Sequence, residues 1–311
     1  MAQSSGTTPV LRIGSRGSPL ALAQAHEVQR ALAAASAIAP AQIAIEVIRT
    51  TGDNIQDRPL AEVGGKGLFT KEIEQALLSR TIDMAVHSSK DMPTALPPGL
   101  VLSAFLPRED PRDAFISRKA KSLAELPAGA VVGTASLRRQ AMLKRLRGDL
   151  AVVALRGNVQ TRLRKLEAGD VDATVLAVAG LKRLGLVGEA TALLDVDEFL
   201  PAVGQGAIGI ETRADDAATT TLVGKINDAD TATALAAERA FLAVLDGSCQ
   251  TPIAGHARIE DGVVRFRGMI LRPDGSAAFE ASREGHRDEA AALGADAGRE
   301  LRRRAGADFF G

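Results

Sequence analysis

The segment VLRIGSRGSPLALAQAHEVQRALAAA (residues 10–35) contains the first strand and the first helix of the fold that the sequence predicts. Residues 10–13 are mainly apolar and predict a short strand. Ser18-Pro19 opens a helix that continues to about Ala35, because proline suits the first helical position. A strand followed directly by a helix is the repeating unit of α/β domains.

The alternation of strands and helices continues along the first part of the chain. Residues 43–48 alternate apolar and polar side chains and predict a second strand. Apolar residues at i, i+4, i+7 and i+8 from Phe69 predict a helix, and residues 82–86 predict a third strand that ends in HSSKD (87–91). This β-α-β-α order favours a parallel sheet, with ligands bound at the carboxyl ends of its strands.

The same rhythm restarts after residues 106–113, which contain two prolines and alternating charges and are typical of a linker. The two halves share a layout rather than a sequence, and this predicts two similar α/β lobes. Further strands are expected at residues 130–132, 151–155 and 173–178, and helices are expected to begin at Ser136 and near Val159.

The C-terminal third has a different pattern. A short strand at residues 207–211 precedes a long alanine-rich helix that contains Glu238 and that Gly247 would end. Residues 263–271 are strand-like and lie between two Asp-Gly turn signals, so hairpins are expected. A last helix at about residues 288–304 would cover this antiparallel sheet. These features predict a separate small α+β domain.

The composition excludes several classes of protein. Lysine plus arginine equals aspartate plus glutamate, 38 each, and tryptophan and tyrosine are absent, so a general nucleic-acid binder is not expected. The single cysteine excludes an internal disulfide framework, and the four histidines show no metal-ligand spacing. No segment reaches the roughly 20 apolar residues of a membrane span, and the N-terminus lacks a signal-peptide pattern. The expected location is the cytoplasm.

Two glycine-rich segments resemble nucleotide-binding motifs but lack the context that these motifs need. GQGAIG (204–209) has the spacing of the dinucleotide fingerprint, yet a proline-containing loop precedes it and an alternating strand follows it. A structural turn is therefore favoured. VGGKG (63–67) lacks the Walker spacing and predicts a flexible loop with one cation, which suits a lid.

Cationic side chains gather where the predicted strands end. Ser136 is a natural N-cap, so Arg138 and Arg139 fall in the first turn of a helix, where cations oppose the helix dipole and favour a bound anion. A solvated helix face is the alternative. Because the strand ends of a doubly wound sheet converge on one crevice, the pattern predicts a site for a polyanionic ligand. Further cations at such positions are Arg16, Arg156, Arg162, Lys182 and Arg183.

Two other residues are candidates for chemistry. Asp91 follows Lys90 at a strand end and is either an ion-pair partner or an acid, a base or a stabiliser of a cationic intermediate. Cys249 lies in the turn-rich loop DGSCQTP (246–252) and is either a small buried residue or a reactive thiol. The residues alone thus indicate a cationic crevice, a carboxylate and a loop thiol.

Taken together, these segments closely resemble the porphobilinogen deaminase family. The resemblance runs from about Leu11 to at least Gly275, with the motifs in the family's order. The motifs are IGSRGSPLA (13–21), VGGKGLF (63–69), VHSSKDMP (86–93), GTASLRRQ (133–140), LRGNV (155–159), LKR (181–183), AVGQGA (202–207) and the loop that contains Cys249.

The resemblance implies two doubly wound α/β lobes, similar to those of type II periplasmic binding proteins, plus a C-terminal α+β domain with an antiparallel sheet. It implies domain 1 at residues 1–106 and 207–224, domain 2 at residues 112–200 and domain 3 at residues 229–311. It also implies a transferase of tetrapyrrole biosynthesis. Such an enzyme deaminates and joins four porphobilinogen molecules head to tail on a covalent dipyrromethane primer, and then releases hydroxymethylbilane by hydrolysis.

By the same resemblance, Cys249 holds the dipyrromethane cofactor through a thioether, and Asp91 is the catalytic carboxylate. The expected partner is the small molecule porphobilinogen, without a metal, a nucleic acid or a membrane, and the expected state is a monomer. The matching cofactor- and substrate-binding residues are Arg16, Ser18, Lys66, Ser88, Lys90, Thr134, Ser136, Arg138, Arg139, Arg156, Gly157, Asn158, Arg162, Arg183 and Gln205.

Two other functions stay open at this point. A solute-binding or sensory protein on the same two-lobed scaffold would explain the crevice and its arginines, but not the C-terminal domain with its loop thiol. A cysteine hydrolase that uses Cys249 with His256 lacks a clear third residue to orient the histidine.

Overall fold

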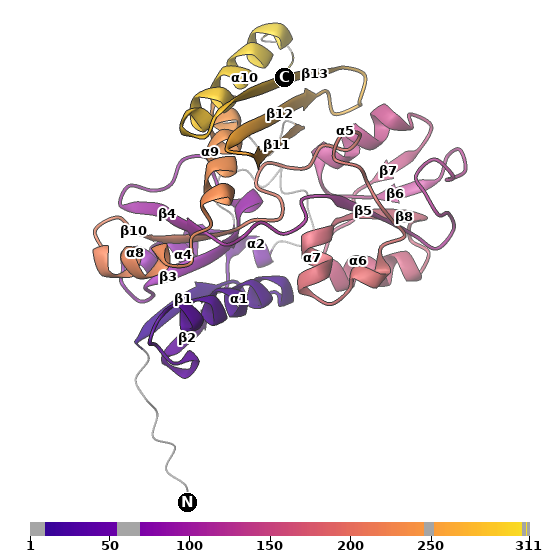
Figure 1. Cartoon of the computed structure of the whole chain (residues 1–311). Coiled ribbons are helices and arrows are strands. Elements are labelled where there is room, and N and C mark those ends of the chain that lie inside the picture. Colours follow the sequence, from indigo (N-terminus) through magenta and orange to yellow (C-terminus); the bar gives the residue numbers. More distant parts are fainter. Residues whose placement is uncertain (1–9, 55–68, 246–251, 307–308, 310–311) are drawn as a thin grey trace, which may run out of the picture.

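The computed structural model describes residues 10–54, 69–245, 252–306 and 309. These residues form two lobes, each around a five-stranded sheet, and a C-terminal unit around a three-stranded antiparallel sheet (Figure 1). The expected α/β lobes and the expected C-terminal α+β unit are confirmed. The residue limits of the three domains stay a prediction.

The first lobe is built around a mixed sheet with the strand order β2-β1-β3-β10-β4. Its elements are β1 (Leu11–Ser15), α1 (Pro19–Ala35), β2 (Ile43–Val47), α2 (Thr51–Asn54), α4 (Lys71–Leu78), β3 (Met84–Ser88), β4 (Leu100–Phe105), β10 (Ile208–Arg213) and α8 (Ala217–Gly224), with 3₁₀ turns at Pro40–Gln42 and Ser89–Asp91. Ser18 caps α1 as expected, because its side chain accepts a hydrogen bond from the N–H of Ala21. Helices α1 and α8 pack on one face of the sheet and α4 packs on the other.

The second lobe has the strand order β7-β6-β8-β5-β9. Its elements are β5 (Asp113–Ser117), β6 (Val131–Gly133), α5 (Leu137–Leu146), β7 (Ala151–Val153), α6 (Val159–Glu167), β8 (Ala173–Ala177), α7 (Val178–Arg183) and β9 (Ala192–Leu193), with a 3₁₀ turn at Val187–Glu189. Helix α5 packs on one face of the sheet, and α6 and α7 pack on the other. The strands and helices expected here are present within two or three residues of their predicted ends.

The chain crosses between the lobes twice. Residues 106–112 lead from β4 to β5, and residues 194–207 lead from β9 back to β10. In each sheet the strand that follows a crossing runs antiparallel to its neighbours, so the expectation of parallel sheets is wrong at β5 and β10. Gly204 and Gly206 in the return crossing have φ values of 73° and 93°, and a strand rather than a helix follows them. The interpretation of GQGAIG as a structural turn is confirmed.

The C-terminal unit is an antiparallel sheet with helices on one face. Its elements are α9 (Ala229–Val244), β11 (Ile253–Glu260), β12 (Val263–Leu271), β13 (Ala278–His286) and α10 (Ala290–Ala305), with a 3₁₀ turn at Arg287–Glu289. Both expected hairpins are present, and Asp261 and Gly262 have positive φ, as the tight turn between β11 and β12 requires. Even-numbered residues of β12 face α9 and α10, whereas Met269 and Leu271 pack against the core of the second lobe.

A buried carboxylate joins the C-terminal unit to both crossings. Glu238 of α9 is fully buried and accepts hydrogen bonds from the guanidinium of Arg108 and from the N–H groups of Gly204 and Ala257. Removal of either partner of a buried ion pair destabilises the fold strongly, because the remaining charge stays buried and uncompensated. The expected long helix around Glu238 is confirmed, but it ends at Val244, and Gly247 lies outside the described residues.

We expect Gly294→Ala to destabilise the chain by about 1–3 kcal/mol, because α9 and α10 pack too closely for an added methyl group. A Cβ at this position would overlap the backbone carbonyl of Ala237. Thermal unfolding measures the effect. Gly188→Ala is the control, since its Cβ would meet no atom within 4 Å. Equal midpoints for both variants would show that the helices separate without cost.

Candidate active site

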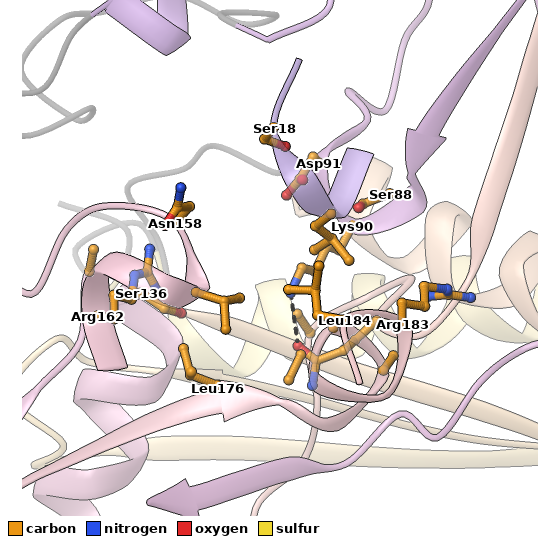
Figure 2. Close-up of a pocket in the computed structure, with 18 of the residues that line it drawn as sticks. Ser18, Ser88, Lys90, Asp91, Ser136, Asn158, Arg162, Leu176, Arg183 and Leu184 are labelled. Atoms are coloured by element: carbon orange, nitrogen blue, oxygen red, sulfur yellow. Dashed lines mark hydrogen bonds between the residues drawn. The ribbon is translucent and has the colours of Figure 1, made fainter. Parts of the chain in front are cut away.

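A cleft with a volume of about 720 Å³ lies between the two lobes. Residues of the first lobe, among them Lys90 and Asp91, face Asn158 and Arg162 of the second lobe across it (Figure 2). The sequence-predicted residues that line this cleft are Arg16, Ser18, Ser88, Lys90, Asp91, Ser136, Arg138, Arg139, Arg156, Gly157, Asn158, Arg162, Arg183 and Gln205.

The first-lobe wall of the cleft forms where β1 and β3 end. Arg16 directly follows β1, and its guanidinium lies 4.1 Å from the centre of the Phe69 ring. A 3₁₀ turn directly follows β3 and carries Lys90 and Asp91. Because β1 and β3 are parallel neighbours, their carboxyl ends deliver these side chains to the same edge of the sheet.

The pKa of the Lys90 ammonium group is lowered by its surroundings. Its Nζ reaches into the cleft and lies 3.5 Å from Oε1 of Gln205. Desolvation by the surrounding protein and then repulsion from Arg139 lower the pKa of Lys90 to about 8, although Asp91 attracts the ammonium group. A carboxylate bound beside Lys90 would oppose this shift, because its negative charge favours the ammonium form.

A buried carboxylate engages two of the predicted arginines. Arg138 and Arg139 lie in the first turn of α5, behind the N-cap Ser136, as the sequence predicts. Both are 5% exposed, and each has a guanidinium nitrogen 2.7 Å from Asp113. Burial raises the pKa of Asp113, but the attraction of both arginines outweighs burial and holds that pKa well below its usual range. A ligand carboxylate must therefore share these guanidinium groups with Asp113.

Arg162 lies in a strongly cationic part of the second-lobe wall. Its Nε donates to the carbonyl of Gly157 at 2.9 Å, and Asn158 beside it caps α6. Burial and then repulsion from Arg139 and Arg156 lower the pKa of Arg162 to about 10. An anion placed here would relieve this repulsion, since it would compensate several cations at once.

Arg183 connects the two lobes. Its Nε donates to Oε2 of Glu27 in α1 at 2.9 Å, and its terminal nitrogen donates to the carbonyl of Gly206 at 3.1 Å. The sequence places Lys182 and Arg183 just beyond a strand, but both end helix α7. Lys182 binds Glu109 in the first crossing at 2.8 Å. Both cations thus hold the second lobe against the first lobe and its crossing.

Three predicted site residues do not appear in the cleft wall. Thr134 is 2% exposed, and its hydroxyl accepts a hydrogen bond from the N–H of Ser136 at 3.2 Å, so it supports the start of α5 from behind. Lys66 and Cys249 lie outside the described residues.

The structure adds lining residues that the sequence reasoning missed. Lys165 lies three residues after Arg162 on α6, and this helical spacing was an available signal. Gln24 of α1 also lines the cleft. No pattern in the sequence indicates several apolar residues of the wall, among them Leu20, Leu176, Ala179, Gly180 and Leu184.

The described lining residues are strongly cationic. Asp91 is the only acidic residue among them, against eight cations. Such a cleft concentrates anions and suits a ligand with several carboxylates. The cations are Arg16, Lys90, Arg138, Arg139, Arg156, Arg162, Lys165 and Arg183.

Within the described ranges, no group of three or more histidine, cysteine, aspartate or glutamate residues is placed to hold a metal ion. No helix in these ranges is long and apolar enough to cross a membrane.

Family models match most of the chain. Residues 11–221 match the dipyrromethane cofactor binding domain of porphobilinogen deaminase, and residues 232–303 match its C-terminal domain. The chain belongs to the porphobilinogen deaminase family. Porphobilinogen deaminase of Nitrobacter hamburgensis is 64% identical over 309 residues, which cover 99% of this chain and 98% of that protein. Porphobilinogen deaminase of Paracoccus denitrificans is 59% identical over 300 residues, which cover 96% of each chain.

Solved structures of binding proteins are more distant. A nutrient-binding protein of Burkholderia cenocepacia, bound to methionine, has 17% identity and a TM-score of 0.43, and the match covers 70% of this chain and 91% of that chain. The methionine-binding protein MetQ has 15% identity and a TM-score of 0.44, with coverage of 70% and 89%. Membership of the porphobilinogen deaminase family rests on the family models and the curated relatives.

The cofactor of the porphobilinogen deaminase family fits the cleft chemically. A dipyrromethane with acetate and propionate groups presents several carboxylates, and the cleft presents six guanidinium groups and two ammonium groups against one acid. The cofactor is attached to a cysteine in this family, and the chain has one cysteine, Cys249. The structure places both flanks of its loop in the C-terminal unit, at the end of α9 and the start of β11.

We expect Asp113→Asn to destabilise the chain by about 3–5 kcal/mol, because it leaves two buried guanidinium groups uncompensated. Because the pKa of Asp113 is lower in the folded state, its carboxylate stabilises that state fully at pH values above the unfolded-state pKa of about 4. This contribution to the free energy of unfolding is lost progressively as the pH falls below this value. The variant should therefore lose less stability on acidification than the unaltered chain.

Thermal unfolding at several pH values measures both effects. Asp149→Asn is the matched control, since Asp149 pairs with Arg147 at the surface and should leave the midpoint unchanged. Similar midpoints for the two variants would contradict the assigned role of Asp113.

Proposed function

We propose that the cleft between the lobes binds the acetate and propionate groups of porphobilinogen and of the chain built from it, with Asp91 as the catalytic carboxylate. The excess of cations carries this proposal, because eight cations line the cleft and Asp91 is the one acid among the described lining residues. A single carboxylate placed there contributes little to charge balance. Its position at a strand end, beside the reacting groups, suits a chemical task.

The reaction is the polymerisation of porphobilinogen in tetrapyrrole biosynthesis, and the chain acts as a transferase. Four molecules are joined head to tail with loss of ammonia, and hydrolysis releases hydroxymethylbilane. When bound through a thioether to Cys249, the dipyrromethane supplies the free pyrrole position that primes the chain.

Asp91 accepts hydrogen bonds from pyrrole N–H groups and stabilises the positive charge that develops as ammonia leaves. One preorganised group of this kind in a site that excludes water lowers the barrier by roughly 3–4 kcal/mol. Asp91 lies on a 3₁₀ turn directly after β3, and Arg239 of the C-terminal unit donates to the carbonyl of Pro93 just beyond this turn, so the backbone that carries the carboxylate is fixed.

The cations bind and orient the carboxylates. Guanidinium forks at Arg16, Arg156 and Arg162 suit bidentate contacts, and Lys90 contributes a point charge. Such contacts hold the reacting ring in place and so convert a bimolecular step into a step between positioned groups. The remaining binding residues in the proposal are Ser18, Lys66, Ser88, Thr134, Ser136, Arg138, Arg139, Gly157, Asn158, Arg183 and Gln205.

The proposal also assigns tasks to three domains. Domain 1, at residues 1–106 and 207–224, carries Asp91, and domain 2, at residues 112–200, supplies most of the arginines. Domain 3, at residues 229–311, carries the cofactor-attachment cysteine. The enzyme works as a cytoplasmic monomer with a small-molecule substrate and without nucleic acid, membrane or metal.

A cysteine hydrolase gains no support. His256, the base that such an enzyme would use, lies in β11, and desolvation by burial lowers its pKa to about 4 even though Glu238 attracts the charged form. An imidazole with so low a pKa is a weak base toward a thiol.

Intact mass tests the attachment of the cofactor. We expect the purified chain to exceed its sequence mass by one dipyrromethane and the Cys249→Ala variant to show the sequence mass, because the chain has no second thiol. Turnover should be lost together with the extra mass. An active chain without added mass would rule out the proposed function.

The role of Asp91 is tested by Asp91→Asn, which keeps the size of the side chain and removes its charge. We expect the cofactor mass and the unfolding midpoint to persist while turnover falls by about 10²–10³-fold. Steady-state kinetics with porphobilinogen measure the change. Turnover within a few-fold of the unaltered enzyme would reduce Asp91 to an ion-pair partner.

A further inference from the structure

A small recess beside the cleft connects Asp91 with a buried histidine. The recess has a volume of about 60 Å³, and Asp91, Ser88 and His87 are among the residues that line it. Asp91 and Ser88 also line the main cleft, so the recess adjoins the proposed reaction site. This volume admits a few water molecules, since one water needs roughly 10–15 Å³ measured in this way.

The imidazole of His87 is held from one side by a carboxylate. His87 lies in β3 and is 6% exposed, and its Nε2 lies 3.0 Å from Oε2 of Glu211 in β10, whose side chain is fully buried. In the part of the chain that the structure describes, this is the only hydrogen bond to the ring, so Nδ1 has no protein partner. A carboxylate that fixes one ring nitrogen orients the other nitrogen for proton transfer.

A second buried carboxylate, Glu74, interacts with the pair of His87 and Glu211. Glu74 of α4 is 7% exposed, and burial followed by repulsion from Glu211 raises the pKa of Glu74, while His87 opposes this shift. Glu74 and Glu211 each have one buried carboxyl oxygen without a hydrogen-bond partner among the described residues. Asp91 and Arg16 line the same recess as His87.

The segment that carries Asp91 is fixed by hydrogen bonds before and after its 3₁₀ turn. Before the 3₁₀ turn, the hydroxyl of Ser88 exchanges hydrogen bonds with the side chain of Gln24 at 2.9 and 3.1 Å. After the turn, Arg239 of α9 donates to the carbonyl of Pro93 at 2.8 Å, and Glu211 attracts the same guanidinium. Packing alone does not require a polar pair between β3 and β10, because apolar residues would fill this space at least as stably.

We propose that His87, oriented by Glu211, accepts the proton that each addition of porphobilinogen releases, through water in the recess that Asp91 lines. This inference rests on the proposed function of the cleft. The substrate's C–N bond breaks and its electron pair goes to nitrogen, so the ammonium group of the substrate departs as ammonia. The freed methylene carbon forms a C–C bond with the free pyrrole carbon of the primer or chain.

The pyrrole carbon then loses its proton, and the electron pair of the broken C–H bond restores the aromatic ring. The proton passes through the recess to Nδ1 of His87, and Glu211 stabilises the resulting imidazolium. The imidazolium then transfers the proton to the released ammonia or to solvent, which regenerates the neutral ring for the next addition.

Chemical rescue of His87→Ala tests this proposal. We expect turnover to fall by about 10²–10³-fold while the cofactor mass is retained, because a positioned acid–base group contributes on this scale. Small azoles of similar size should restore turnover in the order of their basicity: 4-methylimidazole, imidazole, then 1,2,4-triazole. Rescue that is independent of basicity would reduce His87 to a packing residue and overturn the proposal.

The matched control is His26→Ala, since His26 is exposed on α1 and bonds only to Gln29 among the described residues. It should retain full turnover. If His87→Ala does not load the cofactor, His87→Gln is measured instead, because glutamine keeps an amide donor that can face Glu211. Normal turnover of a cofactor-loaded His87 variant would overturn the proposal, whereas the absence of cofactor mass in the unaltered chain would overturn the proposed function.

Glu211→Gln gives a readout that does not depend on turnover. In nitrogen-15 NMR spectra of the purified chain, the Nε2–H signal of His87 should move upfield in this variant, because the carboxylate acceptor is lost. Turnover should fall at least tenfold with KM changed less than twofold, since Glu211 does not touch the substrate. An unchanged ring signal, or a change confined to KM, would contradict the inference.

Discussion

The buried carboxylate of Asp113 accepts hydrogen bonds from Arg138 and Arg139 of α5 and from Gln205 of the return crossing. Burial of an isolated carboxylate costs several kcal/mol, and two adjacent guanidinium groups repel each other. Each of the three charges is therefore stable in its buried position only when the other two are present. Gln205 extends this arrangement to Lys90 in the first lobe. The cationic wall of the cleft therefore has its shape because one internal anion compensates two of its arginines.

A second buried carboxylate ties the C-terminal unit to the same region. Glu238 binds Arg108 in the first crossing and the N–H of Gly204 in the return crossing. The unit that carries the cysteine loop is thereby fixed to the two segments that join the lobes. In the proposed function, this arrangement would let a cofactor attached to the C-terminal unit lie against the cations and the carboxylate of the two lobes.

Local signals allowed much of the fold to be predicted, because N-caps, Asp-Gly turns and apolar periodicity act within a few residues. Ser18 and Ser136 cap helices as expected, and the hairpins around β12 are present. The partners of the arginines could not be predicted. The sequence of residues 106–113 is typical of a linker, yet Asp113 begins β5. It binds Arg138, 25 positions away, and Gln205, 92 positions away. Long-range pairing of this kind leaves no periodic trace in one sequence.

The central claim is that the carboxylates of the pyrrole chain lie in the cleft against its cations, with Asp91 at the pyrrole N–H groups. A high-resolution crystal structure of the cofactor-loaded enzyme tests it most directly. The account predicts cofactor carboxylates within hydrogen-bond distance of Arg16, Arg156 or Arg162 and the Asp91 carboxylate within that distance of pyrrole nitrogen. Carboxylates that point into solvent, with Asp91 directed away from the rings, would contradict it.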